Sequence, residues 1–152
     1  MTRQKIILTG EALDIGRWSD WLAEDPACGA VAGFTGLVRA AQGLEALELQ
    51  HHPVLTLQAL ERIARDATGR FGLAGVVLAH RHGRMAVGTP IVHIACACGH
   101  RRDALAGVSY MIDMVKTRAP FWKREWRTDG PHWIEPTQAD HEAARRWMEE
   151  KT

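Results

Sequence analysis

The residues best suited to chemistry form the run KTRAPFWKREW at positions 116–126, which places four cations and three aromatic side chains around Pro120. Ammonium and guanidinium groups hold phosphate or carboxylate, and flat side chains can cover a ring. The segment therefore suits an anionic ligand that contains a ring. An ordinary strand that buries its aromatics and exposes its cations would have the same composition, because runs of charge usually face water.

Two lysines of this run, Lys116 and Lys123, are candidates for proton transfer or nucleophilic attack. A lysine that is partly desolvated and crowded by other cations has a lowered pKa, and Arg118 and Arg124 supply such cations. The chain has no recognisable Ser-His-Asp triad or phosphate-binding glycine loop. The nearby acidic residues are isolated from one another and do not form the pair of carboxylates that acid–base catalysis would use. We therefore expect structural roles for Asp113, Glu125 and Asp140.

A second cationic group, His100, Arg101 and Arg102, stands at the start of a predicted long helix. A helix N-terminus offers free amide donors and partial positive charge, so His100 and Arg101 could bind phosphate or carboxylate there. The alternatives are an arginine that lies along the apolar surface and, at the other end of the helix, a lysine that only complements the helix dipole.

Arg101 and Lys116 are 15 residues apart, and a helix that rises about 1.5 Å per residue separates them by roughly 22 Å. One small ligand does not reach both ends. If both groups serve one site, the simplest arrangement is a dimer in which the helix start of one subunit meets the helix end of the other.

The elements that must position these groups follow from hydrophobic periodicity and from helix and turn signals. Strands are predicted at 5–8, 28–38, 44–50, 73–80, 90–98, 121–126 and 132–134, and helices at 13–22, 53–69, 101–119 and 139–150. The helix from 101 is the clearest, and Pro120 ends it because proline disfavours helical geometry in the preceding residue. Its apolar stripe comprises Ala104, Leu105, Val108, Met111, Ile112 and Val115.

The connections between these elements predict the fold class. The strand at 44–50 is expected to run antiparallel to the strand at 28–38 through a turn at Gly43, and the segment that contains Gly83 and Gly88 is expected to form a loop. Gly69 is expected to end the second helix. Strands and helices mix without a strict βαβ rhythm, which indicates an α+β fold.

Length and composition fit one globular domain over residues 1–152, with enough apolar residues to bury a core. Lysine plus arginine (19) nearly cancels aspartate plus glutamate (18), which argues against a non-specific nucleic-acid binder. The first residues include neither a signal-peptide core nor a membrane span, so we expect a cytoplasmic protein with no membrane partner.

The three cysteines, an odd number, fit a reducing compartment better than a disulfide framework. Cys96 and Cys98 lie two apart on a predicted strand and so share one face. With His100 they could hold a metal, but no second paired cluster accompanies them, and small buried thiols are the favoured interpretation. We therefore expect no metal site.

Three blocks of this sequence resemble the large, catalytic subunit of molybdopterin synthase. The first covers residues 29–39, and the second joins His80-Arg81-His82-Gly83 with Gly99-His100-Arg101. The third is the most specific and joins Met111-Ile112-Asp113 with KTRAPFWKRE at 116–125. The likeness spans nearly the whole chain in the same order.

The resemblance implies an α/β-hammerhead-type fold with an additional antiparallel β subdomain. It also implies a homodimer that forms the core of a heterotetramer, with one small ubiquitin-like subunit at each end. In this family, the Gly-Gly C-terminus of the small subunit carries a thiocarboxylate and gives sulfur to cyclic pyranopterin monophosphate, also called precursor Z. The chain would then be a sulfurtransferase of molybdenum cofactor biosynthesis, without a cofactor of its own.

The resemblance also assigns residues by position. Lys116 and Lys123 match the functional lysines near the inserted tail, and Arg39 matches an active-site arginine. His100 and Arg101 match a pair that binds substrate from the neighbouring subunit. The resemblance therefore implies phosphate and pterin binding by Arg39, His100 and Arg101, and tail positioning and proton transfer by the two lysines.

The chain departs from the family pattern at three positions. His52 stands where a tyrosine is usual, Thr89 where a glutamate is common, and His132 where an arginine is frequent. None of these changes removes a lysine or an arginine of the candidate site.

Two other functions fit part of the pattern. A non-catalytic module could use the same pocket to bind a peptide tail or an anionic metabolite. Aromatic and cationic side chains could also form a platform on which single-stranded nucleic acid stacks. The residues of such a platform would be Arg118, Phe121, Trp122, Arg124 and Trp126. The near-zero net charge of the chain counts against this function.

Overall fold

The structure, a computed structural model, describes residues 2–149, which form eight strands and four helices. In chain order these are β1 (Arg3–Thr9), α1 (Ile15–Leu22), β2 (Ala30–Leu37), β3 (Leu44–His51), α2 (Leu55–Phe71), β4 (Gly75–Arg81), β5 (Gly83–Ala86), β6 (Pro90–Cys98), α3 (Arg101–Arg118), β7 (Phe121–Arg127), β8 (Gly130–Ile134) and α4 (Gln138–Glu149). The last residue of the helix predicted at 139–150 lies outside the described residues.

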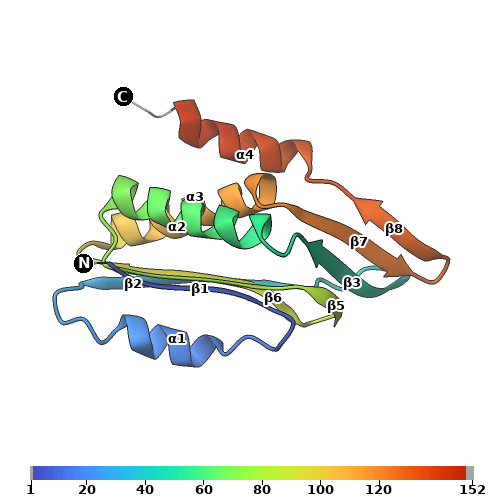
Figure 1. The fold of residues 1–152 in the computed structure, drawn as a ribbon, viewed down its shortest axis with the longest axis horizontal. Coiled ribbons are helices and arrows are strands. Elements are labelled where there is room, and N and C mark those ends of the chain that lie inside the picture. The colour runs from blue at the N-terminus through green and yellow to red at the C-terminus, as the bar shows by residue number, and fades with distance from the viewer. Residues whose placement is uncertain (1, 150–152) are drawn as a thin grey trace.

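The strands form two sheets. The first sheet has the order β1-β4-β6-β2, with β1 parallel to β4 and the other pairs antiparallel. The second sheet has the order β5-β3-β7-β8 and is antiparallel throughout. Helices α2 and α3 cover one face of the first sheet and α1 the other (Figure 1). The α+β prediction and the additional antiparallel subdomain are confirmed.

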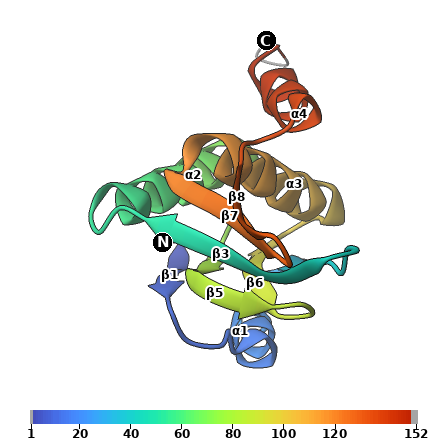
Figure 2. The ribbon, with the colours of Figure 1, turned by 90° about the vertical axis from the view of Figure 1, so that its right-hand side faces the viewer.

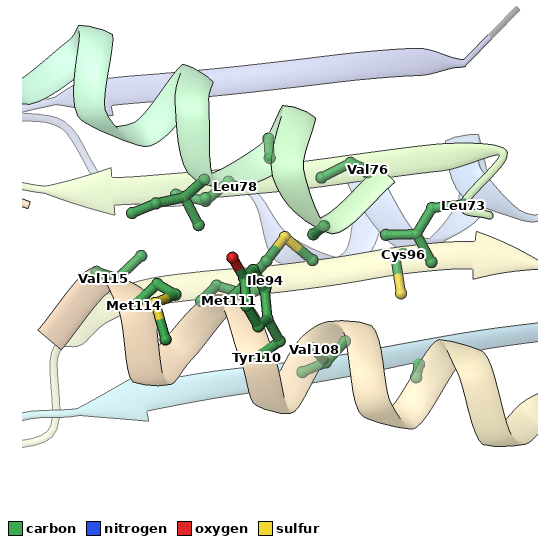
Figure 3. Packing of buried hydrophobic residues seen from close by; sticks show 14 of the residues in the cluster. Leu73, Val76, Leu78, Ile94, Cys96, Val108, Tyr110, Met111, Met114 and Val115 are labelled. Carbon is green, nitrogen blue, oxygen red and sulfur yellow. The ribbon is translucent and has the colours of Figure 1, made fainter. Parts of the chain in front are cut away.

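The core lies between the first sheet and the helices α2 and α3. The central strands β4 and β6 are covered on both faces, which explains their nearly continuous runs of apolar residues. Figure 3 shows Leu78 and Ile94 of these strands facing Met111 and Met114 of α3. Burial of this apolar surface is the main stabilising contribution and holds α3 against the sheet.

The buried face of α3 differs in part from the predicted stripe. Leu105 is 62% exposed, whereas Tyr110 and Met114 are buried. The reason is that α3 packs against α2 and α4 as well as the sheet, and Tyr110 contacts Phe71 of α2 and Trp147 of α4 edge to face. Because of these contacts between helices, the buried face of α3 includes Tyr110 and Met114 and leaves out Leu105, which hydrophobic periodicity alone does not predict.

The predicted hairpin between 28–38 and 44–50 is wrong. β3 does not pair with β2 but lies between β5 and β7 in the second sheet. The chain leaves the first sheet at Val38, whose N–H donates to the Thr89 carbonyl at 2.9 Å and whose carbonyl accepts from the Gly88 N–H at 2.8 Å. Val38 then packs with Leu47 and Leu49 of β3, so apolar contact draws the following strand into the second sheet.

Two further segments differ from the predictions in ways that bear on the packing. Residues 83–86 form β5 rather than a loop, because Met85 is buried against β3 and Gly83 adopts a φ of 97° that turns the chain into the strand. Helix α2 continues past Gly69 to Phe71 and ends at Gly72, which has a left-handed conformation with φ 65°. The contacts of Phe71 with Tyr110 and Trp147 stabilise these two additional helical residues.

The preference for buried thiols at Cys96 and Cys98 is confirmed. Both side chains lie in the main core, where the Cys96 thiol donates to the Ala104 carbonyl at 3.2 Å and the Cys98 thiol to the His100 carbonyl at 3.1 Å. Burial and the neighbouring Cys98 raise the pKa of the Cys96 thiol to about 12. Across residues 2–149, no helix is long and apolar enough to cross a membrane.

The core contacts of α3 lead to a stability prediction. Met111 is completely buried, so Met111→Ala should lower the free energy of unfolding by about 2–5 kcal/mol through lost burial and the cavity left behind. Met148→Ala is the matched control, because Met148 is 40% exposed on α4, and we expect a change of about 0.5 kcal/mol or less. Urea denaturation of both variants measures this difference, and equal losses would contradict the described packing.

Candidate functional site

Lys123 lies on β7 between two strands, opposite Leu49 of β3 and Ile134 of β8. Its side chain is partly buried and shares a strand face with Phe121, whose ring packs against the apolar cluster beneath the sheet. Residues two apart on a strand share a face, so the common face of Phe121 and Lys123 follows from the regular alternation of β7. Lys123 is therefore the cation of the run 116–126 that the second sheet turns toward the interior.

The other face of β7 carries a separate set of contacts. The Arg124 guanidinium lies 4.8 Å from the centre of the Trp126 ring and 5.0 Å from that of Trp133. Arg124 also forms a 2.9 Å ion pair with Glu48 of β3, whose other carboxylate oxygen accepts from the Trp126 indole N–H at 2.9 Å. One face of β7 is thus a surface of paired side chains, and the other carries the candidate lysine, whose role in ligand binding stays a prediction.

Charged groups from several segments act on Lys123. Burial lowers its pKa, and the positive charges of Lys116 and Arg39 lower it further, while Glu125 and Asp140 oppose the change. Lys116 comes from the last turn of α3, and Arg39 from the link that follows β2. The structure therefore brings together Arg39, Lys116 and Lys123, three of the five residues predicted for the site.

The link between α3 and β7 fixes Lys116 relative to Lys123. The Thr56 side chain is buried at the start of α2, and its hydroxyl donates to the Pro120 carbonyl at 2.7 Å. The same hydroxyl accepts from the His52 N–H at 2.9 Å. The turn that separates the two lysines is therefore tied to the start of α2 by a partly buried hydrogen bond.

His100 and Arg101 do not join this group within one chain. Both are exposed, and they lie at the first residues of α3, whereas Lys116 lies in its last turn. α3 is one unbroken helix of 18 residues, so the separation of roughly 22 Å that the sequence predicts is retained. The structure places this cationic pair beside the start of β2, where the Gly29 N–H donates to the Cys98 carbonyl at 3.0 Å.

Sequence reasoning missed the histidine next to the lysine face. His80 is 6% exposed, its ring stacks on Phe121 with ring centroids 4.0 Å apart, and its Nδ1 lies 2.9 Å from the Arg81 carbonyl. Burial lowers the pKa of His80 to about 4, so the ring is neutral at physiological pH. No spacing in the sequence shows this contact, because it joins the ends of β4 and β7 from different sheets.

The acidic residues divide into two kinds. Asp113 has the structural role expected of it, since it accepts a 2.7 Å hydrogen bond from the Trp147 indole. Glu125 and Asp140 also make structural contacts, since Glu125 pairs with Arg127 at 3.0 Å and Asp140 accepts from the Thr137 N–H at 2.9 Å. In addition, both carboxylates raise the pKa of Lys123. Asp140 comes from the first turn of α4, so only the three-dimensional fold reveals its position.

Two of the three unusual positions have local structural roles. The Nδ1 of His52 accepts hydrogen bonds from the Val54 and Leu55 N–H groups and so caps the start of α2. His132, in the middle of β8, lies 2.8 Å through its Nε2 from the carboxylate of Asp129 in the turn between β7 and β8. The His52 contact lies at a helix start, whereas His132 stands opposite Glu125 and so lies on the sheet face that carries Lys123.

Comparison with known proteins shows which family this chain is similar to. The sequence model of the MoaE protein family matches residues 8–118. The molybdopterin synthase catalytic subunit of Caulobacter vibrioides is 49% identical over 123 residues, which cover 80% of this chain and 82% of that protein. The molybdopterin synthase catalytic subunit of Escherichia coli K12 is 38% identical over 150 residues, which cover 97% of this chain and 100% of that protein.

A solved structure extends the likeness to the fold. The molybdopterin biosynthesis MoaE protein from Burkholderia ambifaria has a TM-score of 0.81 and 37% sequence identity, and the match covers 97% of this chain and 99% of that chain. At this coverage the likeness includes β7 and Lys123, which lie beyond the residues matched by the family model.

The electrostatics of the site can be tested directly. Lys116→Met should raise the pKa of Lys123 toward the ordinary lysine value, because it removes a neighbouring positive charge and keeps the length of the side chain. Lys5→Met on β1 is the control and should leave Lys123 unchanged. An NMR titration of isotope-labelled lysine side chains measures both, and identical titration of Lys123 in the parent and in Lys116→Met would contradict the described site.

Proposed function

This chain belongs to the MoaE protein family, and we propose that it acts as the catalytic subunit of a molybdopterin synthase. In this reaction, sulfur passes from the thiocarboxylated Gly-Gly C-terminus of a small ubiquitin-like partner to cyclic pyranopterin monophosphate. The product carries the dithiolene of molybdopterin. Two sulfur atoms are needed, so two loaded tails are used in turn.

The observation that carries this proposal is the convergence of Arg39, Lys116 and Lys123 from three separate segments of the chain. Both reactants are anionic, since the tail ends in a thiocarboxylate and the substrate carries a phosphate. A cluster of three cations beside a partly buried strand face favours the binding of both anions.

The lysines have a second role in the proposed reaction. Each transfer ends when water cleaves the acyl–sulfur bond, which leaves a carboxylate on the tail and the sulfur on the substrate. Such a step needs a group that gives and takes protons near neutral pH, and the lowered pKa of Lys123 suits this task. We assign tail positioning and proton transfer to Lys116 and Lys123, and phosphate binding to Arg39.

The remaining predicted residues, His100 and Arg101, would come from a second copy of the chain. Within residues 2–149, β2 is an edge strand with β6 as its only neighbour. It also exposes three large apolar side chains, Val31, Phe34 and Leu37. An unpaired apolar edge is a template for pairing with another strand, and it supports β2 as the contact between two copies.

Antiparallel pairing of β2 with its own copy would complete the site. His100 lies just beyond Cys98, which pairs with Ala30 at the start of β2, and Arg39 follows the end of β2 at Leu37. A two-fold axis across paired β2 strands sets the start of one strand beside the end of the other. His100 and Arg101 of the second copy would then approach Arg39 and Lys116, which resolves the separation along α3.

We further propose that residues 1–152 act as one catalytic-subunit domain in the cytoplasm. The cysteines support this compartment, because Cys28, Cys96 and Cys98 are all free.

A turnover assay tests the proposed reaction. The chain is mixed with a thiocarboxylated small subunit and precursor Z, and molybdopterin is quantified. Lys116→Ala and Lys123→Ala should each reduce product formation by about 100-fold or more, as expected when a proton-transfer group is lost. Both variants should still bind the small subunit, because neither change removes the surrounding fold. Lys5→Ala on β1 is the matched control and should keep parental turnover.

Two outcomes would overturn this proposal. One is unchanged turnover in both lysine variants. The other is a parent protein that binds the small subunit or the substrate but forms no product, which would favour the non-catalytic binding module.

Mixing two inactive variants tests the proposed dimer. Lys123→Ala and Arg101→Ala each lose activity alone, but a mixed dimer has one site that takes Lys123 from one copy and Arg101 from the other. With random exchange half the dimers are mixed, so about a quarter of the parental activity should return. If mixed dimers form and no activity returns, the two groups do not meet across the subunit contact.

A further inference from the structure

Helix α4 packs against the body of the molecule mainly through Trp147 and the buried Ala144. The Trp147 indole N–H donates to Asp113 of α3 at 2.7 Å, and its ring meets Phe71 and Tyr110 edge to face at 5.8 and 5.5 Å between ring centroids. The Arg70 guanidinium also lies 5.3 Å from the Trp147 ring centre. These contacts give α4 a defined face toward α3.

Asp140 lies on that same face. Asp140, Ala144 and Trp147 have the spacing i, i+4 and i+7, which places them on one side of a helix, and Ala144 is buried. Along α4, Asp140 precedes Trp147 by about 10.5 Å, at 1.5 Å per residue. Figure 1 shows the first turn of α4 near the end of α3 that leads into β7. Lys116 lies in the last turn of α3, and Lys123 lies on β7.

A second connection holds Asp140 near the lysines. Ile134 of β8 pairs with Lys123, and only residues 135–137 separate Ile134 from the start of α4. At this start the Asp140 carboxylate accepts from the Thr137 N–H at 2.9 Å, and the Thr137 hydroxyl accepts from the Asp140 N–H at 3.1 Å. This reciprocal cap fixes the carboxylate, so its position is set from both sides.

The charges agree with this placement. Burial alone would raise the pKa of Asp140, but the Thr137 hydrogen bonds and the charges of Lys116 and Lys123 outweigh it and lower the pKa. The carboxylate is therefore ionised. Figure 2, turned by 90°, shows β7 and β8 side by side and the chain rising from β8 into α4.

We propose that Asp140 is a positioning residue of this site: α4 places its carboxylate near Lys116 and Lys123, where its negative charge balances part of their positive charge. The name of the reaction rests on the function proposed above, but the compensation of charge between Asp140 and the two lysines is a property of this chain alone. Four groups then surround Lys123, namely Lys116, Arg39, Glu125 and Asp140.

Asp140→Asn tests the proposal because it removes the charge and keeps an oxygen that can accept from the Thr137 N–H. The pKa of Lys123 should fall further below the ordinary lysine value, since two cations then face it with only Glu125 in opposition. Asp140→Glu should restore most of the parental titration. Glu142→Gln, an exposed carboxylate two residues further along α4, is the matched control and should leave Lys123 unchanged.

The readout is an NMR titration of labelled lysine side chains in the full chain, which needs no turnover. If Lys123 titrates in Asp140→Asn as in the parent, the proposal is overturned and Asp140 is only a helix cap. In the turnover assay, the limb of the pH–rate profile that reports Lys123 should move to lower pH in the same variant. Absence of turnover in the parent would overturn the proposed function and leave the titration result standing.

Discussion

The packing of α3 against the first sheet is the constraint on which the other features depend. The buried residues of this helix hold it along the sheet, and its length then sets the distance between its two cationic ends. Lys116 lies in the last turn beside β7, while His100 and Arg101 lie at the start beside β2. Asp113, in the C-terminal half of α3, accepts the hydrogen bond from the Trp147 indole that helps to hold α4 against α3. One helix thus supports the lysine site, the proposed subunit contact and the docking of α4.

The second sheet contributes the rest of the site through one strand with two different faces. Lys123 is turned toward an apolar, partly desolvated environment, where burial and nearby cations lower its pKa. Such crowding of like charges costs stability, and the carboxylates of Glu125 and Asp140 offset part of that cost. The balance suits a site that must receive anions, because the remaining positive charge is available to them.

Sequence reasoning predicted the features that depend on local pattern. The helical period of α3 and its end at Pro120 followed from the chain alone. The pairing of β3 could not be predicted, because it depends on Val38 meeting Leu47 and Leu49 across the two sheets. Asp140 was missed for a related reason: its distance to Lys123 is set by the docking of Trp147, which joins residues 34 positions apart in sequence. The family resemblance supplied the proposed roles, which spacing alone left open.

The ion pair on the outer face of β7 has a consequence for strand register. Because side chains alternate along a strand, a slip of one residue would turn Lys123 outward and bring Trp122 inward. Glu48 receives both the Arg124 guanidinium and the Trp126 indole, and it can do so only in the observed alignment of β3 with β7. These contacts therefore disfavour misaligned pairings, and a change at Glu48 would weaken a site whose residues it does not touch.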